Sequence, residues 1–386
     1  MNSYQKLNNL LGWLVFAIAS AVYILTIEPT ASFWDCGEYI ATAYKLQVGH
    51  PPGAPFFQML GRFFTLFAFG NEANVARMVN LMSAFSSSFT ILFLFWTLTM
   101  LAKKLALRNG EMTDSKQYAV FGSATVGALA YTFSDSFWFS ATEGEVYAMS
   151  SFFTALVFWA ILKWDEKADE EHANRWLIFI AYTIGLSIGV HLLNLLAIPA
   201  IAFVYYFRKN QKINRKGLII TFFVSIFLLG LIMNGIIPWI VKLAGYFELL
   251  FVNTFGMPFN SGIIVYFILL IGGIYLGIRI TRKKQKVIAN TFIWGLVFIL
   301  IGYSSFFLLI IRSNANTPID ENNPEDAISL LSYLNREQYG DWPVLHGQYF
   351  NAPIAERVDG NRFIVKAGKK ENILLLIKRR SRTGLS

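Results

Sequence analysis

Nine stretches of this chain are apolar over lengths that can cross a lipid bilayer. A membrane-spanning helix needs about 20 apolar residues, because each residue advances the helix by about 1.5 Å. The stretches cover residues 10–27, 78–101, 118–134, 147–164, 176–190, 192–207, 217–237, 263–278 and 289–311. Hydrocarbon offers the backbone no hydrogen bonds, so spans of this kind fold as helices. The sequence therefore predicts an all-α polytopic membrane protein with about nine transmembrane helices.

Composition supports this class. Of the 386 residues, 55% are hydrophobic and only 15% are charged, which is unlike a soluble protein. The net charge of +9 would suggest nucleic acid in a soluble domain, but here the basic residues cluster in short loops. We therefore expect the lipid bilayer, and no nucleic acid, as a partner. The single cysteine excludes an internal disulfide and a multi-cysteine metal site.

The distribution of basic residues predicts the topology. The segments 1–9, 103–116, 163–175, 208–216 and 279–286 together carry 18 Lys and Arg residues. The alternate segments 28–77, 135–146 and 238–262 carry four. Cytoplasmic loops are the ones enriched in Lys and Arg. The N-terminus is therefore predicted to be cytoplasmic, with residues 28–77 as the first outer loop.

The composition becomes polar after residue 311, so we divide the chain into a transmembrane domain, 1–311, and an extracytoplasmic segment, 312–386. Pro324 fits the first turn of a helix and Gly340 fits its end, which predicts a short helix over 324–339. Val344–Phe350, Arg362–Lys366 and Ile373–Ile377 are typical of short strands. We expect this segment to be a truncated part of a larger domain.

The first outer loop contains the motif Trp34-Asp35-Cys36-Gly37-Glu38-Tyr39. Carboxylates next to lipid are costly unless they have a function. If a helix begins near Ser32, Asp35 and Glu38 are three residues apart and share a face. A carboxylate there is suited to general-base catalysis, and partial burial would raise its pKa toward neutrality. Capping of the helix by Ser32-x-x-Asp35 is the structural alternative.

Two further polar groups are predicted to lie near this motif. His50 is presented by the stretch His50-Pro51-Pro52-Gly53, which proline keeps out of a helix. It lacks a second histidine at ligand spacing, so a zinc site is disfavoured. Glu143 and Glu145 open the fourth span from the outside. Thr142-x-x-Glu145 also matches a capping box, which leaves Glu143 without a structural explanation. All three are candidate substrate-binding residues.

His191 and Asn194 interrupt the fifth and sixth apolar stretches, where we predict a tight turn, with one long kinked segment as the alternative. Both side chains are candidates for binding substrate, although a polar turn explains them equally well. Arg77 and Arg312 lie at the outer ends of spans and are suited to a lipid phosphate, because guanidinium is planar and permanently charged. Snorkelling of an arginine at a helix end is the alternative.

These motifs together resemble the DUF2723 family, bacterial relatives of the TMEM260-type protein O-mannosyltransferases. The resemblance rests on the Trp34–Glu38 motif, Gly49–Gly53, Arg77 with Asn80, Glu143–Tyr147, Gly189–Asn194 and Arg312–Asn314. It implies a glycosyltransferase fold of the GT-C type. By analogy with that class, it also implies that Asp35 is the general base, with Glu38 as its neighbour.

The sequence thus predicts an inverting membrane glycosyltransferase. Its donor would be a polyprenyl-phosphate-linked sugar, with mannose implied by the resemblance alone, and its acceptors Ser or Thr hydroxyls of extracytoplasmic proteins. No cofactor is assigned; a divalent cation beside the acidic loops is left open. The predicted location is the bacterial inner membrane, with the active site facing the periplasm. The alternatives are a transporter or lipid-linked-sugar flippase, and an inactive truncated relative.

Overall fold

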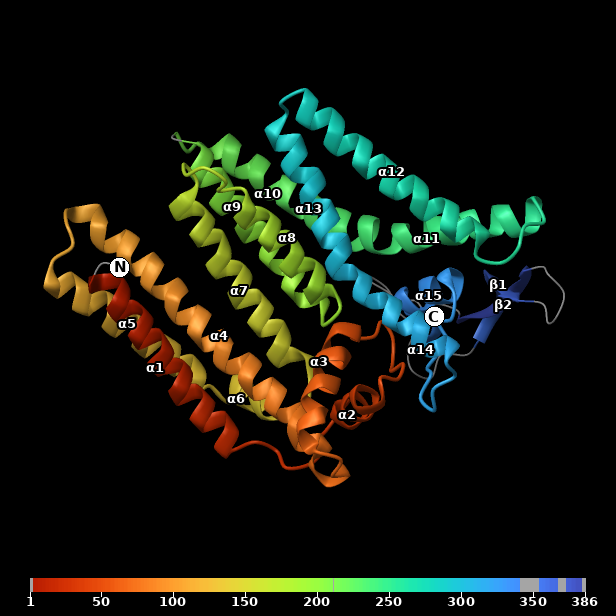
Figure 1. The fold of residues 1–386 in the computed structure, drawn as a ribbon, viewed down its shortest axis with the longest axis horizontal. Coiled ribbons are helices and arrows are strands. Elements are labelled where there is room, and N and C mark those ends of the chain that lie inside the picture. The colour runs from red at the N-terminus through yellow and green to blue at the C-terminus, as the bar shows by residue number, and fades with distance from the viewer. Residues whose placement is uncertain (1–2, 211, 341–353, 367–372, 384–386) are drawn as a thin grey trace.

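The computed structural model describes residues 3–210, 212–340, 354–366 and 373–383. Its first half is a bundle in which one long helix, α4, packs against α1, α5 and α7 (Figure 1). The helices of this half are α1 (Ser3–Leu25), α2 (Cys36–Lys45), α3 (Pro55–Thr65), α4 (Val75–Ala106), α5 (Asp114–Thr132), α6 (Asp135–Thr142) and α7 (Val146–Lys167). Tyr23, Phe95 and Phe137 are buried between α1, α4 and α6.

Among the described residues, the second half adds eight helices, of which α8 and α12 pack against α13. They are α8 (Arg175–Ile188), α9 (Ile198–Lys209), α10 (Arg215–Gly230), α11 (Ile237–Leu249), α12 (Ser261–Lys283), α13 (Val287–Tyr303), α14 (Phe307–Asn314) and α15 (Ala327–Leu334). π-Helical turns at Leu231–Ile236 and Leu250–Thr254 extend α10 and α11 into one helical segment over 215–254. The core here includes Trp164, Tyr303, Leu309 and Tyr333.

Every predicted apolar stretch lies mostly in a helix, and the all-α membrane class is confirmed. In the described part of the chain, seven helical segments are long and apolar enough to cross a membrane, rather than nine. They are Ser3–Leu25, Glu72–Ala106, Val146–Lys167, Leu192–Lys209, Arg215–Thr254, Ser261–Lys283 and Val287–Asn314. The other two predicted spans are α8, which has only 14 residues, and α5, which begins with the polar run Asp114–Gln117. Both still lie beside longer helices, α13 and α4.

The two ends of the bundle differ in character. The α4–α5, α9–α10 and α12–α13 connections, which carry the basic loops, lie on one side, and α2, α3, α14 and α15 gather on the other (Figure 1). On the basic side, Asp165 of α7 pairs with Lys104 of α4 and with Arg208 of α9. The fold therefore separates the basic loops from the acidic ones, as the charge pattern predicts.

The segment after residue 311 folds partly as expected. The predicted helix over 324–339 is wrong in its bounds, because α15 begins after Asp326, whose carboxylate accepts the backbone N–H groups of Ile328 and Ser329. β1 (Ile354–Lys366) and β2 (Ile373–Thr383) pair antiparallel and include the predicted strands 362–366 and 373–377. The predicted strand 344–350 lies outside the described residues.

The close crossing of α8 and α13 provides a test of the fold. At Gly185 an added Cβ would collide with the backbone of Ile299, and at Gly302 with the backbone of Gly185. We therefore expect Gly185→Ala to push α8 and α13 apart and to cost about 1–3 kcal/mol, as overpacking does. The measurement is the thermal unfolding midpoint in detergent. Gly272→Ala on α12, where an added Cβ meets nothing, is the control; equal midpoints for the two variants would contradict the crossing.

Candidate functional site

The acidic motif lies at the start of α2. Trp34 has a positive φ of 59° and turns the chain, so that the helix begins at Cys36 rather than near Ser32 as predicted. Asp35 is the N-cap residue, but its side chain makes no capping hydrogen bond. The Asp35 side chain is 57% exposed. The Ser32-x-x-Asp35 cap, the structural alternative for this motif, is therefore not formed, and the Asp35 carboxylate is open to solvent.

Glu38, in the first turn of α2, holds the loop that follows the helix. Its Oε1 accepts the backbone N–H of His50 at 2.6 Å, and both of its oxygens lie 3.1 Å from His50 Nδ1. Gly49 makes this approach achievable, because any Cβ there would collide with the Glu38 carboxylate. Burial acts to raise the pKa of Glu38, but the hydrogen bonds from His50 outweigh it and lower that pKa. The same contact raises the pKa of His50.

Asp35, Glu38 and His50 form one compact cluster. His50 Nε2 lies 3.9 Å from Asp35 Oδ2, so the imidazole is placed between two carboxylates. One ligand atom from each residue lies within 4.8 Å of the others, a separation that a metal ion could bridge. Carboxylate and imidazole ligands suit several divalent metals. Proton and metal would compete, because His50 Nδ1 already contacts Glu38.

The second acidic loop converges on the first. Glu28 N–H donates to the Thr142 carbonyl at 3.1 Å, and Cys36 Sγ lies 3.6 Å from Glu143 Oε2. Asn80 of α4 holds the start of the first outer loop, because its side-chain amide donates to the carbonyls of Glu28 and Thr30. Glu143 is 4% exposed. Burial raises its pKa, although hydrogen bonds from Ser32 and Cys36 act the other way.

Glu145 is the second buried acid of this region. It is 5% exposed and caps α7 itself, accepting the backbone N–H of Val146 at 2.9 Å. The predicted Thr142–Glu145 capping box is wrong, because Thr142 ends α6 and bonds within it. Burial raises the pKa of Glu145 to about 7, with further contributions from Asp35 and Glu143. Glu145 is thus a desolvated carboxylate with a raised pKa at this end of the bundle.

His191 and Asn194 lie in the turn predicted between the fifth and sixth stretches. His191 Nδ1 accepts the N–H of Leu193 at 3.1 Å, and its ring centroid lies 5.5 Å from that of Tyr147. Burial lowers its pKa, so it is neutral near pH 7. Asn194 is fully buried and donates to Ser187 Oγ at 2.7 Å. The turn lies at the same end of the bundle as the acidic motif. Asn194 itself is bonded to Ser187 of α8 and supports the packing of that helix.

The two candidate arginines differ in what they contact. Arg77 is exposed in the first turn of α4. Arg312 of α14 donates to the backbone carbonyls of Lys45 and Leu46, which end α2. A cation at the C-terminus of a helix is favourable, because unpaired carbonyls carry partial negative charge there. Arg312 therefore positions α2 in this structure, whereas Arg77 leaves its guanidinium accessible.

The structure adds residues that sequence reasoning missed. The segment after α14 pairs with the loop after α2, since Val48 N–H donates to the Ile319 carbonyl and Glu321 N–H to the Val48 carbonyl. This brings Glu321 into electrostatic range of His50 and Glu38. Tyr333 of α15 donates to the carbonyls of Gly49 at 2.5 Å and of His50 at 3.2 Å. No local pattern signals these contacts, which join residues more than 250 positions apart.

Comparison with known proteins identifies similar chains. Residues 35–214 match the model of a family described as the N-terminal domain of the protein O-mannosyl-transferase TMEM260. A protein O-mannosyl-transferase tmem260 of Dictyostelium discoideum is 28% identical over 144 residues, which are 37% of this chain and 16% of the relative. The protein O-mannosyl-transferase TMEM260 of Mus musculus is 29% identical over 178 residues, 45% of this chain and 22% of the relative. The match thus spans less than a quarter of either relative. No solved structure matches the chain.

The Glu38–His50 contact predicts a pH dependence of stability. The pKa of His50 is raised above 6.5. Its contribution to the free energy of unfolding is therefore complete below pH 6.5 and is lost as the pH rises through the raised pKa. The pKa of Glu38 is lowered below 4.5. Its contribution to the free energy of unfolding is therefore present above pH 4.5 and is lost as the pH falls through the lowered pKa. We expect the advantage of the wild type over Glu38→Gln in thermal unfolding to be largest between these limits.

Glu72→Gln is the matched control, because Glu72 is exposed at the same end of the bundle. Its difference from the wild type should stay small at every pH. A difference between the wild type and Glu38→Gln that does not vary from pH 4 to pH 9 would contradict the assigned contact.

Proposed function

We propose that this chain is an inverting membrane glycosyltransferase that moves a sugar from a polyprenyl-phosphate donor to Ser or Thr hydroxyls of extracytoplasmic proteins. Its location would be the bacterial inner membrane, with the active site on the periplasmic side. Two kinds of observation support the activity: similarity of residues 35–214 to protein O-mannosyl-transferases, and the acidic cluster at one end of a membrane bundle. The similarity to those relatives suggests mannose as the sugar.

The observation that carries the proposal is the Asp35 carboxylate. It is exposed, does not cap α2, and lies beside the Glu38–His50 pair. Asp35 would accept the proton of the acceptor hydroxyl as that oxygen attacks the anomeric carbon. The new bond forms on the face opposite the phosphate, and the bond between the anomeric carbon and the phosphate oxygen breaks. The lipid phosphate leaves with the electron pair, so the configuration inverts.

The neighbouring residues would position the reactants. Glu38 and His50 fix the loop beside Asp35 and offer polar atoms to sugar or acceptor hydroxyls. Glu143, Glu145 and His191 would complete the substrate-binding region, whereas Asn194, which is buried and bonded to Ser187, would support the packing of α8. Arg77, whose guanidinium is accessible, is better placed than Arg312 to contact the donor phosphate, since Arg312 is bonded to the end of α2. Arg312 would act by holding α2 in place.

The transporter alternative receives less support. A transporter should keep ionisable groups within its spans for its solute. Glu248 is buried in the segment 215–254, but its carboxylate accepts the backbone N–H groups of Asn260 and Ile263 at 2.6 and 3.1 Å. It therefore caps the start of α12. The acids of the candidate site lie in the loops at one end of the bundle instead.

Replacement of Asp35 tests the assigned base. We expect Asp35→Asn to insert and fold normally but to lose at least about 100-fold in transfer rate, the lower range for general-base catalysis. The assay uses purified protein in nanodiscs, polyprenyl-phosphate mannose and Ser/Thr-rich acceptor peptides. Asp135→Asn, at an exposed acid that begins α6 in the second outer loop, is the control and should remain active.

Glu145→Gln distinguishes the two candidate carboxylates in the same assay. Burial raises the pKa of Glu145 to about 7, but this carboxylate is buried against the start of α7. If Asp35→Asn transfers at the wild-type rate while Glu145→Gln does not, the base is Glu145 and our assignment is wrong. Loss in Asp35→Asn with activity retained in Glu145→Gln supports it.

Chelation tests the divalent cation that the sequence leaves open. We expect transfer to persist in EDTA, because His50 already supplies a positive group to Glu38 and competes with a metal for the same oxygens. The measurement is the initial rate with EDTA and after addition of Mn²⁺ or Mg²⁺. Abolition by EDTA with recovery on adding one ion would show that transfer requires a divalent cation, for which Asp35, Glu38 and His50 are the candidate ligands.

A further inference from the structure

A basic cavity of about 490 Å³ lies where α8 and α13 begin and α12 ends, at the end of the bundle opposite the acidic motif (Figure 1). Its volume is within the range of ligand pockets. The cations in its wall are Arg175 of α8, Arg282 of α12 and Lys286, which precedes α13. His172 also lines it, with Glu171 3.3 Å from its Nε2. Among the residues that the structure describes, neither Asp nor Glu lines the basic cavity, so it attracts anions.

The three cations of the basic cavity have no acidic partner. In the described part of the chain, Arg175, Arg282 and Lys286 form no ion pair and donate no side-chain hydrogen bond. Lys104 and Arg208, on the same side of the bundle, are by contrast paired with acids. Like charges that converge on one cavity repel each other, and an anion from outside removes that repulsion. The arrangement therefore favours a negatively charged ligand.

Two helix N-termini reinforce this preference. α8 and α13 run parallel, because Asn174 Nδ2 donates to Thr291 Oγ1 at 3.3 Å near their starts and the same helices cross closely further along. Neither helix has a side-chain cap or an acidic residue in its first turn. The unpaired N–H groups of a helix N-terminus carry partial positive charge, which an anion stabilises. Arg175 and Lys286 stand at these two positions, so the chain itself supplies no negative charge there.

The rest of the wall indicates that the basic cavity borders the bilayer. Ile178 of α8 and Val287 and Trp294 of α13 line it together with the cations. Phe179 and Phe292, on the same two helices, are exposed, as expected for side chains in contact with lipid. Tryptophan is typical of the interface between lipid and water. Basic pockets between membrane helices at this level bind the head groups of acidic lipids.

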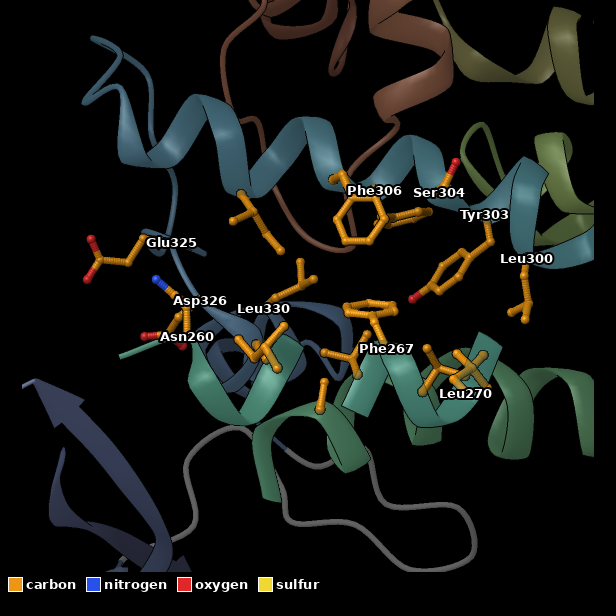
Figure 2. A pocket seen from close by; sticks show the side chains of 17 residues that line it. Asn260, Phe267, Leu270, Leu300, Tyr303, Ser304, Phe306, Glu325, Asp326 and Leu330 are labelled. Carbon is orange, nitrogen blue, oxygen red and sulfur yellow. The ribbon is translucent and has the colours of Figure 1, made fainter. Parts of the chain in front are cut away.

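A second cavity, of about 280 Å³ between α11, α12 and the α13–α14 segment, has the opposite character. Figure 2 shows Phe267, Leu270 and Phe306 in its wall, with Glu325 and Asp326 at one end. Among the residues that the structure describes, no Lys or Arg lines it. An anion there would lose its hydration and face two carboxylates, which is costly. Of these two cavities, the basic one is suited to a phosphate.

We infer that the basic cavity binds a phosphate group, carried by the head group of an anionic lipid or by a soluble phosphate compound. Arg175 and Arg282 can each present parallel N–H donors to phosphate oxygens, and Lys286 adds a compact positive charge. The bound phosphate offsets the repulsion between the two parallel helix starts and holds α8, α12 and α13 together at this end. The site is independent of the activity proposed for the acidic motif.

Titration calorimetry of the full chain in nonionic detergent tests the site. The probes are dihexanoyl phosphatidylglycerol and inorganic phosphate, each titrated at the same ionic strength. The cavity variant combines Arg175→Gln, Arg282→Gln and Lys286→Gln. We expect it to bind the preferred probe about tenfold more weakly than the wild type or worse, because it loses the charged donors to the phosphate.

The control variant combines Arg279→Gln, Lys283→Gln and Lys284→Gln. It removes the same number of charges from the same end of the bundle, but none of these residues lines the basic cavity. We expect it to bind both probes as the wild type does. Should the cavity variant fail to fold, as judged by thermal unfolding, Arg175→Gln alone takes its place, with Arg279→Gln as its control.

The two probes distinguish the sources of the phosphate. Tighter binding of phosphatidylglycerol, lost in the cavity variant, identifies a lipid head group as the ligand. Tighter binding of inorganic phosphate with the same loss identifies a soluble phosphate compound. Equal weakening in the cavity and control variants would overturn the inference, because binding would then follow total charge rather than this cavity. Failure of the wild type to bind either probe would overturn it as well.

Discussion

The contact between Glu38 and His50 holds the candidate site together. One carboxylate receives both the backbone and the side chain of His50, so the first turn of α2 is fixed against the loop that leaves the same helix. Gly49 is required for this, because a side chain there would occupy the space of the carboxylate. Once the loop is fixed, Val48 can pair with the segment after α14, and Tyr333 can reach the carbonyls of Gly49 and His50. The later half of the chain is thereby attached to the first outer loop.

The acids at this end of the bundle occupy different environments. Asp35 is exposed and its side chain does not cap α2, Glu38 is paired with His50, and Glu145 is buried with a pKa of about 7. Sites that use two carboxylates commonly separate their roles through such differences in environment. An exposed carboxylate can meet a hydroxyl delivered by a protein acceptor from water. A buried carboxylate that is protonated in part near neutrality is suited to donating a hydrogen bond within the site.

The helices and the acidic motif could be predicted from the sequence because both depend on local patterns. Apolar runs give helix positions, and the spacing of Asp35 and Glu38 predicts their shared helix turn. The start of α2 was missed because Trp34 adopts a positive φ that its residue type disfavours. Glu321, Tyr333 and the role of Arg312 depend on contacts across 250 residues or more of sequence, for which a single sequence has no signal. Burial of Glu145 rather than Asp35 likewise follows from tertiary packing.

The segment after the last span is part of the same packed unit as the spans. Ala327, Leu330 and Tyr333 of α15 are buried in one cluster with Leu309 of α14, Val48 of the first outer loop and Val241 of α11. A short helix of eight residues would not be stable alone, so α15 depends on this packing. The dependence also runs the other way, because α15 supplies the hydroxyl that orients the Gly49 and His50 carbonyls. A change that loosens α15 should therefore disturb the acidic cluster as well.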